Sequence, residues 1–269
     1  MADYKELNSL KDFNIFDGTF ESIKSHLFMR LFNKYNLPLG KELDSVPHFT
    51  YADMVATLSV EAKEYFSGRR GVRCYMITNE DVEKLGITKE ELKKIAIKNL
   101  QDKNSARIET INQHLVRANI LSPLVNKEDF GAAIQLGGPP KQTNPNTIFS
   151  GDQFGSVMFQ KSESKNVVLI SNRTQTFASI NFVMPGVLNE VHNVFGENFY
   201  IVPSSVHELI CVKSSFITND GDKPEKQAIE DLVDMLEQIN DVVQTNERNI
   251  LSYNVYYYVY EDNGAIKVS

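Results

Sequence analysis

The sequence FYIVPSSVHELICV at residues 199–212 decides the fold expected for the second half of the chain. Two apolar runs that contain β-branched and aromatic residues, 198–202 and 206–212, flank a Pro-Ser-Ser tripeptide at 203–205. Such runs predict strands, and proline followed by serine is typical of a turn. The stretch therefore predicts a tight β-hairpin, around which the rest of the second half can be arranged.

The segments around this hairpin extend the same lobe. Short runs bounded by polar turn residues predict further strands, and two amphipathic segments predict helices. The strands are expected at 156–161, 166–171, 252–260 and 265–269, and the helices at 185–195 and 224–243. The order is ββαββαββ, which predicts a mixed or antiparallel sheet covered by helices.

The first half of the chain is expected to be a helix-rich lobe. Apolar residues recur at helical spacing over 19–35 and over 51–66. Thr88 and Glu91 form a capping box for a further helix over 88–100. Strands are expected to be fewer here than in the second half.

A change in composition divides the two halves. Between residues 137 and 155, glycine, proline and asparagine follow in close order without hydrophobic periodicity, which indicates a loop or linker. We therefore expect a helix-rich α/β lobe at 1–136 and an α+β lobe at 156–269. The fold class expected for the whole chain is α+β.

Composition and charge exclude several classes of protein. The chain has 269 residues, of which 42% are apolar and 23% charged, and no apolar run is long enough to span a membrane. Two cysteines, Cys74 and Cys211, cannot supply a disulfide framework, and the first residues lack the apolar core of a secretory signal. We therefore expect a cytoplasmic protein. Its net charge of −7 disfavours direct binding to nucleic acid.

The hairpin also contains residue types that can catalyse acyl transfer. His207 and Glu208 follow Ser204 and Ser205 directly. On a strand, however, His207 shares a face with Leu209 while Glu208 points to the other face, so the two cannot converge on one atom. We therefore interpret His207 as a hydrogen-bonded core histidine and the serines as turn residues, with a catalytic role as the alternative.

No common cofactor or metal motif is present. The sequence lacks a phosphate-binding loop, a dinucleotide fingerprint, a nucleophile elbow and a paired-histidine zinc motif, so no cofactor and no metal is expected. His48 and Asp53 are expected to hold the start of the helix over 51–66. The alternative hypothesis is a hydrolase or transferase whose site assembles His48, Asp53, His207 and Glu208.

The tyrosine-rich strand is the best interface candidate. Tyr256, Tyr258 and Tyr260 share one face of the expected strand, and Tyr257 lies on the other. One face is expected to pack in the core and the other to bind a partner. An edge strand stabilised by cross-strand aromatic pairs is the alternative explanation.

Several motifs together resemble an uncharacterised bacterial family, a domain of unknown function. They are Val-Pro-His at 46–48, Thr-Asn-Glu at 78–80 and Pro-Ser-Ser-Val-His-Glu at 203–208, and the resemblance covers most of the chain. It implies a common fold and no particular activity. The chain departs from the family pattern at Phe-Ala-Ser-Ile-Asn, residues 177–181, where the resemblance implies a small Gly-Ala-Ala stretch. The motif positions that we treat as candidate binding residues are Asn79, Asn172, Ser204 and Ser205.

These observations favour a non-enzymatic binding or regulatory protein that acts through protein–protein contacts. The expectation rests on the missing cofactor and metal motifs, the acidic composition and the tyrosine strand. The helix over 224–243 adds several acidic residues opposite its apolar stripe. An acidic protein of this kind is suited to occlude a basic partner.

Overall fold

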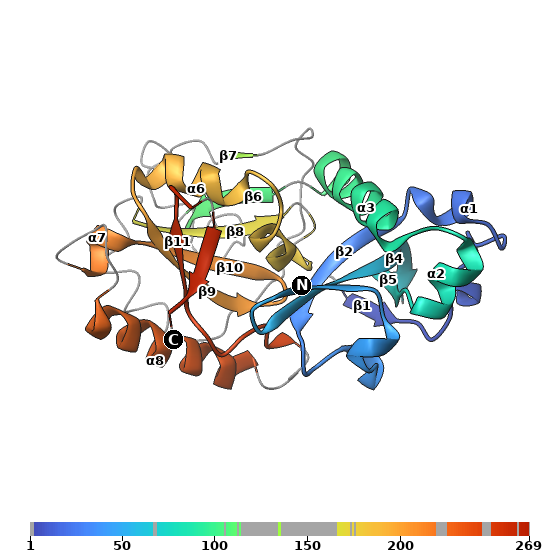
Figure 1. Cartoon of the computed structure of the whole chain (residues 1–269), viewed down its shortest axis with the longest axis horizontal. Helices are drawn as coiled ribbons and strands as arrows, with labels where there is room; N and C mark the ends of the chain where they lie inside the picture. The colour runs from blue at the N-terminus through green and yellow to red at the C-terminus, as the bar shows by residue number, and fades with distance from the viewer. Residues whose placement is uncertain are drawn as a thin grey trace. The chain divides into compact units, whose positions relative to one another are not determined.

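The computed structural model describes residues 3–66, 69–104, 106–111, 113, 134–135, 166–172, 174, 176–218, 225–243, 249–262 and 264–268. The chain divides into two compact units, Ala2–Ser105 and Ala106–Ser269, and each is built on its own sheet (Figure 1). The linker expected at 137–155 and the strand expected at 156–161 lie outside the described residues. Both units combine strands with helices, which confirms the α+β class.

The N-terminal unit is built on a five-stranded sheet and not on helices. The order is β1-β5-β4-β2, with β3 also paired to β4. Its strands are β1 (Asp3–Glu6), β2 (Leu27–Asn33), β3 (His48–Tyr51), β4 (Met54–Phe66) and β5 (Arg69–Met76). β1 runs parallel to β5, and the other pairs are antiparallel. Along one edge of β4, β3 pairs with the first part of the strand and β5 with the second.

Two helices predicted for this unit are wrong. The segment 19–35 forms only the short helix α1 (Phe20–Lys24) and then β2, and the segment 51–66 forms β4. Most of β2 and the first part of β4 are buried on both faces, so their apolar residues do not alternate with polar ones. The helical spacing is therefore accidental, and β-branched residues such as Val55 and Thr57 favour the strand.

Two helices follow β5, and the second begins at the capping box that the sequence predicts. They are α2 (Asn79–Leu85) and α3 (Lys89–Lys103), and α3 packs against β2. Each helix starts with a capping box, which pairs Thr78 with Asp81 and Thr88 with Glu91. The unit also has three 3-10 turns, η1 (Leu10–Asp12), η2 (Pro38–Gly40) and η3 (Leu43–Ser45).

The C-terminal unit has a seven-stranded sheet in the order β12-β11-β9-β10-β8-β6-β7. All of its strand pairs are antiparallel. The strands are β6 (Ala106–Thr110), β7 (Ile134–Gln135), β8 (Val167–Asn172), β9 (Phe199–Ser205), β10 (Glu208–Lys213), β11 (Tyr256–Val259) and β12 (Gly264–Lys267). β11 and β12 form the hairpin predicted at the end of the chain.

Helices cover both faces of this sheet (Figure 1). The helix α8 (Lys226–Val243) buries its apolar stripe against one face. The 3-10 helix η5 (Ala178–Phe182) and the helix α6 (Val187–Phe195) lie on the other, where the rings of Phe195 and Phe199 meet at 5.5 Å. The sheet is therefore the middle layer of three.

The predicted helices at 185–195 and 224–243 are confirmed as α6 and α8. Gly196 ends α6 in a left-handed conformation, with φ of 73°. The short helix α7 (Ser214–Ile217) lies between them in the sequence. No helix in the described part of the chain is long and apolar enough to cross a membrane.

The predicted hairpin is present, but its turn is displaced. The Pro-Ser-Ser tripeptide at 203–205 ends β9, and Val206 and His207 form the turn. The pairing register shifts between Glu208 and Ile210, where β9 has one residue more than β10. Such a β-bulge accommodates proline within a strand, because one hydrogen bond of the ladder is already missing.

Candidate functional site

The imidazole of His207 is buried at the turn between β9 and β10. Its side chain is 4% exposed, and the backbone N–H of Phe177 donates a hydrogen bond to Nδ1 over 3.2 Å. Because Nδ1 accepts, the ring carries its proton on Nε2. Burial lowers the pKa of His207 to about 4, against an opposing hydrogen bond with Asn249. At neutral pH His207 is therefore an uncharged core residue.

Hydrogen bonds from two other segments hold the backbone of the same turn. The carbonyl of Val206 accepts from the Ser179 hydroxyl at 2.8 Å, and the carbonyl of His207 accepts from the N–H of Ala178 at 3.2 Å. The N–H of Val206 donates to the carbonyl of Asn249 at 2.9 Å. Neither turn residue has a positive φ. Two-residue hairpin turns usually have a left-handed backbone conformation. This turn lacks it and is stabilised by tertiary hydrogen bonds instead.

The two serines of the motif are used inside the hairpin. The hydroxyl of Ser204 donates to the carbonyl of Glu208 at 3.1 Å, and the hydroxyl of Ser205 accepts from the N–H of His207 at 3.1 Å. Both serines are buried, and so is Glu208. These contacts fix the end of the hairpin and leave the hydroxyl groups facing the protein backbone.

Asn172 organises the loop that follows β8. Its Oδ1 accepts from the N–H groups of Thr174 and Thr176, at 3.1 and 3.3 Å, and its Nδ2 donates to the carbonyl of Thr176 at 2.7 Å. The side chain is 1% exposed. This Asx-type arrangement brings the chain to Phe177, whose N–H reaches His207. Two motif positions of the sequence, Asn172 and His207, thus hold one loop.

Phe177 itself has a strained backbone. Its φ is 50° and its side chain is buried. A left-handed conformation costs a residue other than glycine about 1 kcal/mol. Phe177 begins the stretch 177–181, where the family resemblance implies small residues such as glycine, and glycine adopts such angles without strain. The phenyl ring compensates by packing against His207, with the ring centroids 5.4 Å apart.

The predicted roles of His48 and Asp53 at a helix start are wrong, because no helix begins there. His48 opens β3, is half-buried, and donates from Nδ1 to the carbonyl of Val46 over 3.0 Å. Asp53 lies in the turn between β3 and β4, next to Ala52 with φ of 54°. Both belong to the N-terminal unit, whereas the other two residues of the alternative hydrolase site belong to the C-terminal unit.

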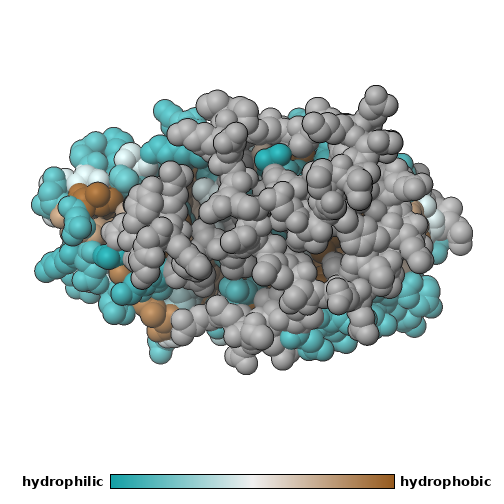
Figure 2. All heavy atoms as spheres, turned by 180° about the vertical axis from the view of Figure 1, so that it is seen from behind, coloured by the Kyte–Doolittle hydropathy of each residue, from teal (hydrophilic) through white to brown (hydrophobic). Residues whose placement is uncertain are grey.

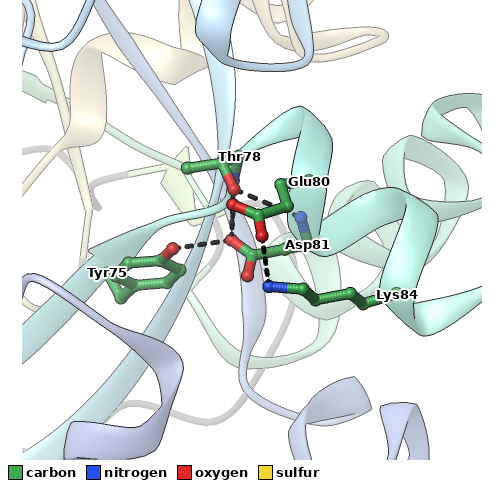
Figure 3. Close-up of polar contacts among 5 residues, drawn as sticks. All are labelled: Tyr75, Thr78, Glu80, Asp81 and Lys84. Atoms are coloured by element: carbon green, nitrogen blue, oxygen red, sulfur yellow. Dashed lines mark hydrogen bonds and ion pairs between the residues drawn. The ribbon is translucent and has the colours of Figure 1, made fainter.

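Asn79 lies in a polar network at the start of α2. Its Nδ2 donates to the carbonyl of Asp44 at 2.7 Å. Beside it, Oδ2 of Asp81 accepts from the hydroxyls of Tyr75 and Thr78, at 2.6 and 2.8 Å (Figure 3). Burial raises the pKa of Tyr75 and keeps its hydroxyl protonated. The network joins the end of β5 to the start of α2.

The N-terminal unit contains a buried ion pair that was not predicted from the sequence. Arg30 on β2 is fully buried, and its Nη1 and Nη2 donate to the two carboxylate oxygens of Glu6 at 2.8 and 2.7 Å. Its Nε donates to the hydroxyl of Ser59 at 2.7 Å. Burial alone would lower the pKa of Arg30, but the charge of Glu6, the hydrogen bonds with Glu6 and the nearby Cys74 and Glu61 together outweigh it and raise that pKa. The pair ties β1 to β2 and β4.

The tyrosine strand has no exposed tyrosine face. Tyr256, Tyr257 and Tyr258 are each 1% exposed, because β11 lies inside the sheet and helices cover both of its faces. Two tyrosines that flank the strand are exposed, Tyr253 at 60% and Tyr260 at 47%. The ring of Tyr260 stacks on His192 of α6 with the centroids 4.1 Å apart.

The exposed face of α8 is acidic. Glu230, Asp234, Glu237 and Asp241 are exposed at the spacing i, i+4, i+7 and i+11, and we call this set the acidic stripe. The helix contains a single basic residue, Lys226, whose Nζ lies 3.4 Å from Glu230. In the reverse view of Figure 2, the edge formed by α8 is coloured hydrophilic.

No group of three potential metal ligands occurs in the described part of the chain. A family model described as a family of unknown function (DUF5688) matches residues 2–259. The chain belongs to this family. The DUF5688 match includes both units, and it confirms the resemblance to a domain of unknown function. No curated protein and no solved structure matches the chain.

Proposed function

We propose that this DUF5688 protein is a non-enzymatic binding or regulatory protein that recognises a basic partner protein through the acidic stripe of α8. The observation that carries the proposal is the stripe itself, which presents four exposed carboxylates along one line of a well-packed helix. A partner with complementary basic residues would be steered to this surface by its charge.

The charge arrangement of α8 works against the helix on its own. Like charges four residues apart, as at Glu230 and Asp234 or at Glu237 and Asp241, each destabilise an isolated helix by about 0.2–0.5 kcal/mol. A lysine in the first turn and an aspartate near the end also oppose the helix dipole. A basic partner would relieve this repulsion, which gives the arrangement a purpose beyond solubility.

The surroundings of the hairpin motif also favour binding over hydrolysis. A general base must accept a proton near neutral pH, whereas burial lowers the pKa of His207 to about 4. Its Nδ1 already accepts from the backbone, and the hydroxyls of Ser204 and Ser205 bond within the hairpin. We therefore assign these residues to the stability of the C-terminal unit.

Affinity capture from the native host tests the proposal with two charge-matched variants. The stripe variant combines Glu230→Gln, Asp234→Asn and Glu237→Gln. The control variant combines Glu83→Gln, Glu90→Gln and Asp102→Asn, which removes three equally exposed charges from helices of the other unit.

We expect one or more basic proteins to be captured by the wild type and the control, and to be lost with the stripe variant. With the purified partner, the stripe variant should bind at least about tenfold more weakly, and added salt should weaken the wild-type complex. Equal capture by the wild type and the stripe variant would refute the proposal, as would an equal loss with the control.

A further inference from the structure

Two lysine ammonium groups converge on one aromatic ring in the N-terminal unit. Nζ of Lys93 lies 4.2 Å from the centroid of the Phe49 ring, and Nζ of Lys89 lies 5.4 Å from it. The two lysines are four residues apart on α3 and so share one face of the helix. Phe49 is half-buried on β3, opposite the small Ala56 of β4. Sheet and helix therefore fix the place where the two charges meet.

Neither ammonium group enters an ion pair with any other described residue. Glu90 lies three residues before Lys93 on α3, but no ion pair joins it to either lysine among the described residues. Glu91 accepts hydrogen bonds from the N–H and the hydroxyl of Thr88 at 3.1 and 2.7 Å. These hydrogen bonds, together with the charge of Lys94, lower the pKa of Glu91. Lys89 and Lys93 are thus left as an unneutralised pair.

We propose that Lys89, Lys93 and Phe49 form a binding site for a phosphate group. Two like charges held on one ring repel each other, and the ring orients them through cation–π attraction without neutralising them. A dianion that contacts both would neutralise them. Lysine binds phosphate as a point charge, and a phosphate group carries about −1.5 to −2 at pH 7, enough to neutralise both ammonium groups, whereas a single carboxylate neutralises one.

The site depends on the two side chains and not on the end of the helix. Glu90 and Glu91 already place negative charge in the first turn of α3. The net charge of −7 repels a phosphate from most of the protein, so a local pair of cations is needed to hold one. The proposed phosphate site belongs to the N-terminal unit, whereas the acidic stripe belongs to the C-terminal unit. The phosphate site therefore does not rest on the proposed function.

Calorimetric titration of the full chain at low ionic strength tests the site, with inorganic phosphate, pyrophosphate and phosphoserine as probes. Carbon-13 spectra of the lysine ε-methylene groups then locate the bound probe. We expect saturable binding of at least one probe, with shifts confined to the signals of Lys89 and Lys93.

Lys89→Gln and Lys93→Gln should each weaken the binding of that probe about tenfold, since each removes a charged hydrogen-bond donor. Lys94→Gln is the matched control on the same helix and should change the affinity less than about twofold. Phe49→Leu, which keeps an apolar side chain, should weaken binding a few-fold.

If phosphoserine binds most tightly, the natural ligand is a phosphorylated molecule. If phosphate or pyrophosphate binds most tightly, the natural ligand is a free anion. Non-saturable titration with all three probes would overturn the proposal. A loss with Lys94→Gln as large as the loss with Lys93→Gln would also overturn it, because it would show diffuse charge attraction and not a site.

Discussion

The substitution Glu6→Gln should destabilise the N-terminal unit far more than its conservative chemistry suggests. Glu6 is the counterion of Arg30, which is fully buried and donates hydrogen bonds to both carboxylate oxygens of Glu6 at 2.8 and 2.7 Å. Glutamine keeps the shape of the side chain but removes the charge. The guanidinium cannot escape by losing its proton, because arginine stays charged in proteins.

The expected cost is about 3–5 kcal/mol, the range found when one partner of a buried ion pair is removed. That is a large share of the roughly 5–15 kcal/mol that stabilises a typical domain. The combination Glu6→Leu with Arg30→Met should recover most of the loss, because apolar residues often replace a buried pair without penalty. Glu21→Gln is the control, since its ion pair with Lys24 is exposed and worth under about 0.5 kcal/mol.

Hydrogen exchange followed by mass spectrometry measures the effect separately in each unit of the full chain. Amides of β2, β4 and β5 should exchange roughly two to three and a half powers of ten faster in Glu6→Gln, with β9 and β10 as the internal reference. An exchange rate no faster than that of Glu21→Gln would refute the reasoning. So would a double variant that is no more stable than Glu6→Gln.

Two further predictions concern the C-terminal unit. Burial lowers the pKa of His207 from the ordinary histidine value of 6.5 to about 4, so between these pH values the unfolded chain binds a proton that the folded chain does not. The free energy of unfolding should therefore fall by about 3 kcal/mol as the pH is lowered from 7 to about 4. His207→Gln should remove this pH dependence. Hydrogen exchange of the amides of β9 and β10, measured at pH 7 and 4.5, compares the variant with the wild type. Tyr258→Ala should lower the free energy of unfolding by about 3–5 kcal/mol, because the ring of Tyr258 is buried against Phe199. Tyr260→Ala, at an exposed position, should lower it by less than about 1 kcal/mol. Thermal unfolding followed by circular dichroism compares the two variants.

The helices could be predicted wherever the sequence marks their ends. Thr88 with Glu91, Gly86 and Gly196 are local signals, since a cap or a left-handed residue involves only its own turn. The amphipathic pattern of α8 was also clear, because one side of that helix faces solvent. These elements were predicted within a few residues.

The strands of the N-terminal unit could not be predicted in the same way. Most of β2 and the first part of β4 are buried on both faces, which removes the alternation that marks a strand at a protein surface. Leucines at positions 27 and 31 then fit a helical repeat as well as a strand. Arg30 in the same run did not indicate a buried strand either. Its partner Glu6 lies on β1, which only the tertiary fold brings within hydrogen-bond distance of Arg30.

The candidate site was predicted in part. The sequence suggested both a structural and a catalytic role for His207. It could not identify the hydrogen-bond partner of the imidazole, because the donor is the N–H of Phe177, thirty residues away in the chain. The tyrosine strand was predicted to have one exposed face, but both faces are buried. Alternation along a strand assigns its residues to two faces and does not show whether helices cover both of them. Tyr256 and Tyr258 are thus core residues.

The parallel pairing of β1 with β5 has a consequence for biosynthesis. A ribosome releases β1 first, yet the strand on which it docks is translated only after β2, β3 and β4. At about 5–20 residues per second the nascent chain therefore spends several seconds with this segment undocked and its glutamate in water. A bulky fusion placed ahead of β1 would delay this last step of assembly and leave the edge of β5 open to aggregation for longer.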